Sequence, residues 1–176
     1  MTNVLVVLGS ARKGRVADRV ASYILQEAKT YNNLSLSVVD LAELELPFYN
    51  DEYSPSDPNY TATDPQVIAW GKRVSEADAV LFVTPEYNHT LSAIQKNAID
   101  WLYAEWKDKP LGIVAYGFYE GKYVLESIQN VIGVVSPDVR NKVGLGLMKH
   151  LNPDGSAIEE DEVVSRINAT VAAVLS

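Results

Sequence analysis

Apolar residues follow two alternating patterns along the chain, one typical of buried strands and the other of helices. Short apolar runs rich in branched residues are typical of strands in a parallel sheet. Such strands are expected at residues 3–8, 78–84 and 111–116. Alternation of apolar and polar residues predicts a further strand at 34–40, and a fifth, with less sharp limits, is expected within 132–147. Apolar residues spaced three or four apart predict helices at residues 16–31, 65–76, 91–103, 123–131 and after 156. The last helix is expected to begin with a capping box, in which Glu159 follows Ser156 by three residues.

The alternation of five strands with five helices predicts a doubly wound α/β domain, with a parallel sheet and helices on both faces. In such a sheet the ligand binds beyond the carboxyl ends of the strands, where the strand order reverses. The loops after the first, third and fourth strands therefore form the candidate site. Residues 41–63, rich in Pro, Tyr, Asp and Ser, are expected to be a functional loop or an interaction surface.

The composition predicts a single folded domain over residues 1–176. Hydrophobic residues make up 47% of the chain and charged residues 22%, which is enough apolar material for a continuous core. The apolar run near the N-terminus ends at Gly9 and has no basic residue before it, so it is too short for a secretion signal or a membrane span. We therefore expect a soluble, cytoplasmic protein.

Charge and the lack of cysteine exclude several classes of function. Without cysteine the chain cannot form disulfides, iron–sulfur clusters or thiolate nucleophiles, so redox chemistry would need a bound cofactor. The two histidines, His89 and His150, show no spacing typical of a metal site. A net charge of −8 disfavours nucleic acid and anionic membranes as partners. A small basic cluster, Arg12, Lys13 and Arg15, is large enough for one phosphate group.

The loop after the first strand has the features of a phosphate-binding loop. It leads into a helix, whose N-terminal N–H groups and partial positive charge favour an anion. Gly9 and Gly14 allow close approach of the backbone, and Ser10 offers a hydroxyl group. Arg12 and Arg15 can donate charge-assisted hydrogen bonds. The alternative interpretation is a simple turn with solvated arginines.

The residues after the two glycines limit the kind of phosphate ligand. Gly9 and Gly14 have the spacing of a P-loop, but Arg15 and Val16 stand where nucleoside triphosphate chemistry requires Lys and then Ser or Thr. The loop also lacks the G-x-G-x-x-G pattern of dinucleotide-binding folds. We therefore expect a ligand with one terminal phosphate.

The loops after the third and fourth strands can accept a planar ring. Pro85 stiffens the first of them, Tyr87 offers an aromatic face, and backbone N–H groups near Asn88 can donate to ring atoms. The second, residues 116–121, adds backbone donors and further aromatic surface. Together with the first loop, they suit an aromatic ring with a phosphate tail.

From about residue 3 to residue 117 the chain resembles the NADPH-dependent FMN reductase family. The resemblance rests on the ordered motifs Gly9-Ser10-x-Arg12-x-Gly14-Arg15-Val16, Thr84-Pro85-Glu86-Tyr87-Asn88-His89, Lys96-Asn97-Ala98-Ile99-Asp100-Trp101-Leu102, Glu105-Trp106, Asp108-Lys109-Pro110 and Tyr116-Gly117. It implies a flavodoxin-like fold with strand order 2-1-3-4-5, bound FMN, NADPH or NADH as electron donor, and a homodimer or homotetramer.

The resemblance also implies roles for particular residues. The phosphate of FMN would be bound by Ser10, Arg12, Arg15 and Val16. The isoalloxazine ring would lie against Pro85, Glu86, Tyr87, Asn88, Tyr116 and Gly117. The chain differs from many members where Arg15-Val16-Ala17 replaces Ser-x-Asn, and where Phe118-Tyr119 replaces a glycine pair.

The implied activity is hydride transfer from the nicotinamide nucleotide, through the flavin, to a small acceptor such as a quinone, a nitro or azo compound, or free flavin. No side chain is assigned as a catalytic acid or base. His89 is expected to be a surface or hydrogen-bonded structural residue.

Two other classes share this type of fold. A flavodoxin would bind FMN but carry electrons without oxidising NAD(P)H, and its phosphate loop is typically rich in Ser and Thr, whereas this one contains arginines. This alternative stays open. A phospho-acceptor receiver domain needs an acidic cluster after the first strand and an Asp at the end of the third, where this chain has Gly9-Ser10 and Pro85. The receiver domain is therefore set aside.

An aromatic group, Trp101, Tyr103 and Trp106, lies near the end of the third predicted helix. Other apolar residues of that helix already form an inward stripe, so we expect the aromatic group to form a surface for a partner chain. This pattern predicts a homo-oligomer.

Overall fold

The computed structural model describes all 176 residues, and its five strands form one parallel sheet in the order β2-β1-β3-β4-β5. The strands are β1 (Thr2–Leu8), β2 (Leu34–Asp40), β3 (Ala79–Pro85), β4 (Pro110–Gly117) and β5 (Asp138–Gly146). The helices are α1 (Ala17–Ala28), α2 (Pro65–Glu76), α3 (Ala93–Asp100), α4 (Lys122–Val135) and α5 (Glu160–Val174). The predicted flavodoxin-like fold and strand order are confirmed, and the segment between β2 and α2 contains no helix or strand.

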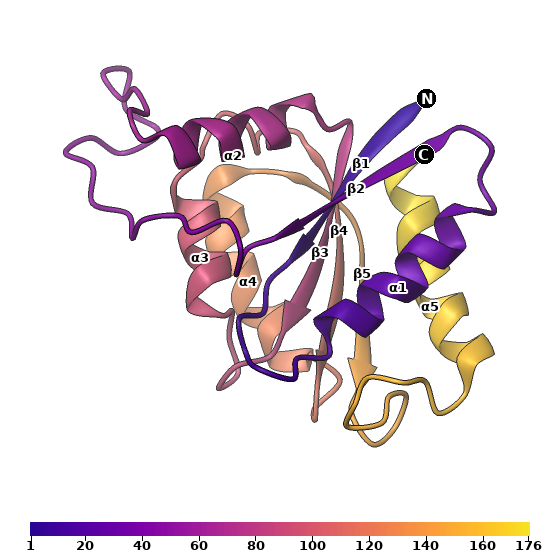
Figure 1. Cartoon of the computed structure of the whole chain (residues 1–176). Helices are drawn as coiled ribbons and strands as arrows, with labels where there is room; N and C mark the ends of the chain where they lie inside the picture. Colours follow the sequence, from indigo (N-terminus) through magenta and orange to yellow (C-terminus); the bar gives the residue numbers. More distant parts are fainter.

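The sheet lies between two layers of helices (Figure 1). Helices α1 and α5 cover one face, and α2, α3 and α4 cover the other. Successive side chains of a strand point to opposite faces. In β1, Val4 and Val6 therefore pack in the core with α1 and α5, whereas Leu5 and Val7 pack in the core with the other three helices. Burial on both faces explains why this strand is apolar without interruption.

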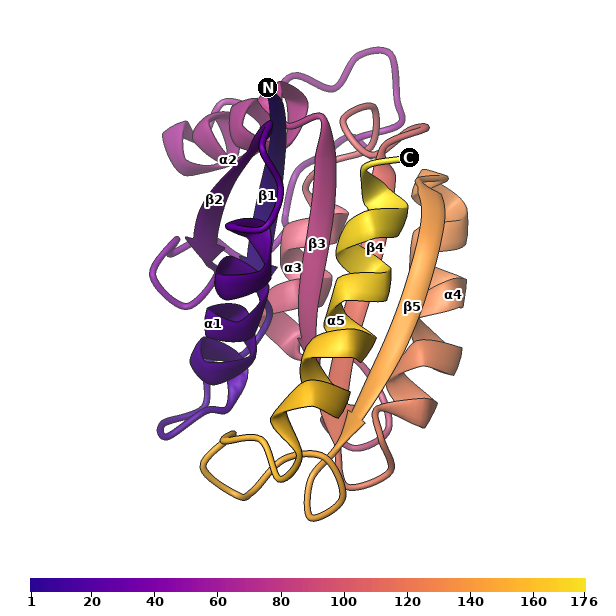
Figure 2. The same ribbon diagram turned by 90° about the vertical axis from the view of Figure 1, so that its right-hand side faces the viewer.

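The strand order reverses at β1, because the chain first adds β2 on one side of it and then β3 on the other. Since β1, β3 and β4 are neighbours and parallel, their carboxyl ends lie side by side at one end of the sheet. Figure 2 shows the strands from the side of α1 and α5, with the strand arrowheads directed to that end. This arrangement brings the three candidate loops together.

Trp101 and Trp106 are buried within the chain, so the expectation of an exposed aromatic partner surface is wrong for both, and only Tyr103 of the group is exposed. Trp106 is 2% exposed, and its ring lies 5.9 Å from that of Trp70 and 5.6 Å from that of Phe82. Trp101 is 4% exposed, and its indole N–H donates to the carbonyl of Pro47 at 2.7 Å. Both tryptophans follow the end of α3, which is shorter than predicted. Helical spacing therefore does not decide which way they face.

The last helix begins without the predicted capping box. Helix α5 starts at Glu160, and the side chain of Glu159 makes no capping hydrogen bond. The hydroxyl and backbone N–H of Ser156 instead donate to the Asp154 carboxylate, at 2.7 and 2.9 Å. The Ser156 side chain therefore forms a local turn with Asp154 and is not available for the capping box. None of the five helices has both the length and the apolar composition required to cross a lipid bilayer.

Candidate cofactor-binding site

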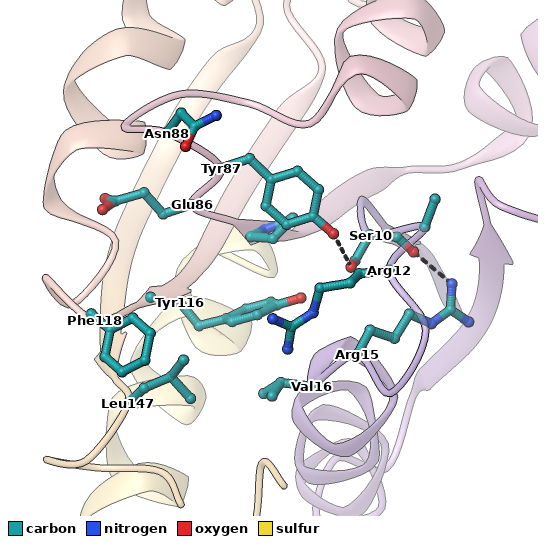
Figure 3. Close-up of a pocket in the computed structure, with 13 residues that line it drawn as sticks. Ser10, Arg12, Arg15, Val16, Glu86, Tyr87, Asn88, Tyr116, Phe118 and Leu147 are labelled. Atoms are coloured by element: carbon teal, nitrogen blue, oxygen red, sulfur yellow. Dashed lines mark hydrogen bonds between the residues drawn. The ribbon is translucent and has the colours of Figure 1, made fainter. Parts of the chain in front are cut away.

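A pocket of about 590 Å³ opens at the carboxyl ends of β1, β3 and β4 (Figure 3). All ten residues proposed from the sequence line it: Ser10, Arg12, Arg15, Val16, Pro85, Glu86, Tyr87, Asn88, Tyr116 and Gly117. Ala11, Phe118 and Leu147 complete the lining. Leu147 was not proposed, although it directly follows β5 and the same strand-end argument would have found it.

The loop after β1 presents a row of backbone N–H groups that have no acceptor in the chain. None of the N–H groups from Ser10 to Asp18 donates to a protein atom. The N–H groups in the first turn of a helix have no partner within the helix. Here they form one continuous row with the free N–H groups of the preceding loop. Gly14 has a φ of 64°, a left-handed conformation that glycine adopts without strain. The loop and the start of α1 therefore line the pocket with free donors, an arrangement suited to an anion.

The two arginines of this loop have different surroundings. Arg12 is exposed at the pocket and makes no hydrogen bond or ion pair within the chain. Arg15 donates to both carboxylate oxygens of Asp18, each at 3.0 Å. It also donates to the carbonyl of Ser10 at 2.6 Å and, through two nitrogens, to the carboxylate of Asp40. Arg12 is thus the lining arginine that is free to bind an anion.

The charge state of Asp40 follows from its contacts. Partial burial raises the pKa of this carboxyl group, but hydrogen bonds from Arg15 and from the backbone N–H of Ala42 outweigh burial, so its pKa lies below the ordinary value. The hydrogen bonds to Asp40 and Asp18 in turn raise the pKa of Arg15. Asp40 is not among the predicted site residues, because it ends β2, and only the ends of β1, β3 and β4 were expected to form the site.

The loop after β3 is a tight hairpin turn. Tyr87 and Thr90 exchange two backbone hydrogen bonds of 3.0 Å, and between them Asn88 and His89 have φ values of 48° and 67°. Their own backbone N–H groups have no acceptor in the chain. The His89 ring stacks on the ring of Tyr123 in α4, with centroids 4.0 Å apart. His89 therefore contacts α4, and the turn presents free donors.

Glu86 connects this loop to the start of α4. Its carboxylate accepts hydrogen bonds from the backbone N–H groups of Tyr123 and Val124, at 3.0 and 3.2 Å. A carboxylate at this position satisfies two donors and favours the positive end of the helix dipole. A Cβ atom at Gly117 would lie 2.8 Å from that of Glu86, so only glycine allows this close approach. Glu86 thus positions the backbone around the pocket.

Tyr116 lines the pocket with a hydroxyl group that has no hydrogen-bond partner in the chain. Burial raises the pKa of Tyr116 to about 12, so the hydroxyl is neutral and able to donate. A buried donor without an acceptor is costly. An acceptor on a bound ligand would satisfy it, and together with the free N–H groups and Arg12 this fits a phosphorylated aromatic cofactor such as FMN.

Comparison with known proteins also points to FMN. The sequence model of the NADPH-dependent FMN reductase family matches residues 2–145. An NAD(P)H-dependent FMN reductase of Schizosaccharomyces pombe is 35% identical over 130 residues, which cover 74% of this chain and 65% of that protein. One from Saccharomyces cerevisiae is 35% identical over 136 residues, which cover 72% and 71%. The chain therefore spans about two thirds of the length of these curated relatives.

Among solved structures, the flavoenzyme FerB, an NAD(P)H:(acceptor) oxidoreductase of Paracoccus denitrificans, matches with a TM-score of 0.74. The alignment covers 99% of this chain and 98% of that one at 23% identity, and it shows a shared fold. The fold, the pocket motifs and the match over residues 2–145 lead to one conclusion: the chain belongs to the NADPH-dependent FMN reductase family.

Proposed function

We propose that the chain binds FMN in this pocket and uses it to transfer hydride from NADPH or NADH to a small acceptor, such as a quinone, a nitro or azo compound, or free flavin. The observation that carries the proposal is that the ten residues expected to bind FMN line one pocket. The two yeast relatives are named NAD(P)H-dependent FMN reductases, which supports the same activity.

The phosphate group would be bound by the loop after β1. Arg12 supplies a charge that no carboxylate of the chain neutralises, while Ser10 and Val16 contribute the backbone of the loop and of the helix start. Charge-assisted hydrogen bonds of this kind are stronger than neutral ones. A single terminal phosphate fits this set of donors, so FMN is expected rather than FAD.

The ring would lie between the loops after β3 and β4. Its neighbours there are Pro85, Glu86, Tyr87, Asn88, Tyr116 and Gly117. FMN held there would supply the redox chemistry, which is hydride transfer from the nicotinamide nucleotide and two-electron reduction of the acceptor. The free N–H groups of the Asn88-His89 turn are fixed donors, and donors held in place stabilise negative charge without reorganisation.

The side chains at the rim suit a flat, apolar second substrate. Phe118 is 74% exposed although it lines the pocket, and Leu147 lies close to it (Figure 3). Apolar groups beside the ring would exclude water and bind a planar acceptor through burial of its faces. No side chain is assigned a proton-transfer role.

The proposal is tested with the purified protein and added FMN, FAD and riboflavin. A flavin absorbance spectrum, tight binding of FMN and steady oxidation of NADPH or NADH with a quinone are the expected results. FMN binding without oxidation of NAD(P)H would favour a flavodoxin-type electron carrier. Failure to bind FMN in calorimetry would overturn the proposal.

A homodimer or homotetramer and a cytoplasmic location stay predictions. Trp101 and Trp106 give no support for an oligomer, because both side chains are buried within the chain. Membership of the family is the remaining support for an oligomer. Light scattering tests the oligomer, since any oligomer would have at least twice the chain mass of 19.4 kDa.

A further inference from the structure

Arg15 has no hydrogen-bond donor left for a ligand. A guanidinium group carries five N–H bonds. Nε donates to Asp18, one terminal nitrogen donates to the Ser10 carbonyl and to Asp40, and the other donates to Asp18 and to Asp40. These five contacts use every donor of the side chain. A phosphate could bind Arg15 only by displacing one of them.

Displacement from Asp40 is unfavourable. The side chains of Arg15 and Asp40 are only 16% and 11% exposed. Removing Arg15 would leave the carboxylate of Asp40 partly buried without its main partner, and such a charge is costly. The two carboxylates, Asp40 and Asp18, also outnumber the single positive charge of Arg15. This cluster therefore does not attract an anion, whereas Arg12 does.

The contacts of Arg15 connect the loop to two other elements. Asp40 is the last residue of β2, Asp18 lies in the first turn of α1, and Ser10 lies in the loop itself. Figure 3 shows the hydrogen bond between Arg15 and the Ser10 carbonyl. Because the peptide bond is trans, the N–H of Ala11 points to the side opposite this carbonyl. Arg15 thereby keeps the carbonyl oxygen away from an anion and fixes the direction of the neighbouring N–H.

We propose that Arg15 is a positioning residue, paired with Asp40, that holds the phosphate loop in its anion-binding shape, and that Arg12 makes the direct contact with the phosphate. The inference rests on the proposed FMN site and differs from the role that family resemblance implies for Arg15. It assigns to Asp40 a function in FMN binding although its side chain does not line the pocket.

The test compares FMN with riboflavin, which lacks the phosphate, in titrations followed by flavin fluorescence. The variants are Arg12→Gln, Arg15→Gln, Arg15→Lys, Asp40→Asn and the double variant Arg15→Gln/Asp40→Asn. Arg12→Gln should weaken FMN roughly 10- to 100-fold and leave riboflavin nearly unchanged, as expected for one charge-assisted contact with phosphate. Lys29→Gln, which removes the charge of an exposed lysine at the far end of α1 and outside the pocket lining, is the matched control.

Asp40→Asn should also weaken FMN, because the carboxylate that orients Arg15 is lost. Arg15→Lys should not restore the affinity lost in Arg15→Gln, since the three donors of an ammonium group cannot replace the five hydrogen bonds that the guanidinium makes. The double variant should lose no more FMN affinity than the weaker-binding of the two single variants, because both changes remove the same Arg15–Asp40 interaction.

Two results would overturn the inference. One is wild-type FMN affinity in Arg15→Lys, since a direct phosphate contact tolerates lysine. The other is unchanged or tighter FMN binding in Asp40→Asn, as expected if the freed Arg15 reached the phosphate. If Arg15→Gln does not fold, as judged by circular dichroism, Asp40→Asn and Arg15→Lys still decide the question. If the wild-type protein does not bind FMN, the proposed function fails instead.

Discussion

The hydroxyl groups of Ser10 and Tyr87 lie 2.7 Å apart and join the loop after β1 to the loop after β3. Ser10 is almost completely buried, so its hydroxyl cannot exchange this partner for bulk water. The hydrogen bond fixes the loop proposed to bind the phosphate relative to the loop proposed to bind the ring.

Tyr87→Phe should therefore lower the free energy of unfolding by about 1 kcal/mol, the usual net value of one such bond. Urea unfolding of the protein without cofactor measures the change. Tyr103→Phe is the control, because the Tyr103 hydroxyl makes no hydrogen bond within the chain. Equal losses in the two variants would contradict a role for the Ser10–Tyr87 bond.

Glu86→Ala should destabilise the protein by about 0.5–2 kcal/mol, because two N–H groups at the start of α4 lose their acceptor. Glu86→Gln should cost less, roughly 0.3–1 kcal/mol, since the amide oxygen still accepts but the favourable charge at the helix N-terminus is removed. Glu126→Gln, further along α4 and without a hydrogen bond, is a control for both in urea unfolding. A loss in Glu126→Gln as large as in Glu86→Ala would argue against the cap.

Acid should remove the stabilisation that Asp40 provides. The pKa of Asp40 in the folded chain lies below its ordinary value of 3.8, so the unfolded chain binds its proton more readily. The contribution is complete above that ordinary value and is lost as the pH falls through the lower folded-state pKa. The difference in unfolding free energy between wild type and Asp40→Asn should be constant at neutral pH and shrink below about pH 4. A difference that grows in acid would exclude this linkage.

Turnover should follow ping-pong kinetics. The nicotinamide nucleotide and the acceptor both need to reach the flavin ring through one pocket, so they are expected to bind in succession. Double-reciprocal plots of initial rate at several acceptor concentrations should be parallel. Converging lines would indicate a ternary complex and contradict this order.

Local signals in the sequence determined the secondary structure well where both ends of an element are marked. Helix α2 begins at Pro65, as predicted, because proline suits the first helical turn and the Asp64 carboxylate accepts from Gln66 and Val67. Strands β1, β3 and β4 were visible because burial on both faces requires apolar residues at nearly every position, whereas the edge strands β2 and β5 are less buried and carry a weaker apolar signal. The capping box at Ser156 failed, because the nearby Asp154 offers that side chain another local partner.

The lining of the pocket was also accessible from the sequence. Each candidate loop directly follows a buried strand, and parallel neighbouring strands bring their carboxyl ends together. Ser10, Pro85 and Tyr116 could thus be placed in one site without knowledge of side-chain conformations. The resemblance to the family added the expected strand order and the expected ligand, FMN.

Only the tertiary structure decided which side chains in the site are free. Arg12 and Arg15 are equivalent in the sequence, but Asp40 approaches Arg15 from β2 and uses its donors. In the same way, the buried indole N–H of Trp101 donates to the carbonyl of Pro47, which lies far from it in the sequence. The sequence by itself determined the strands, the loops and the types of group at the site, because these depend on local pattern. The pairing of those groups depends on chain segments that meet only after folding, and this is why the structure was needed to distinguish the two arginines.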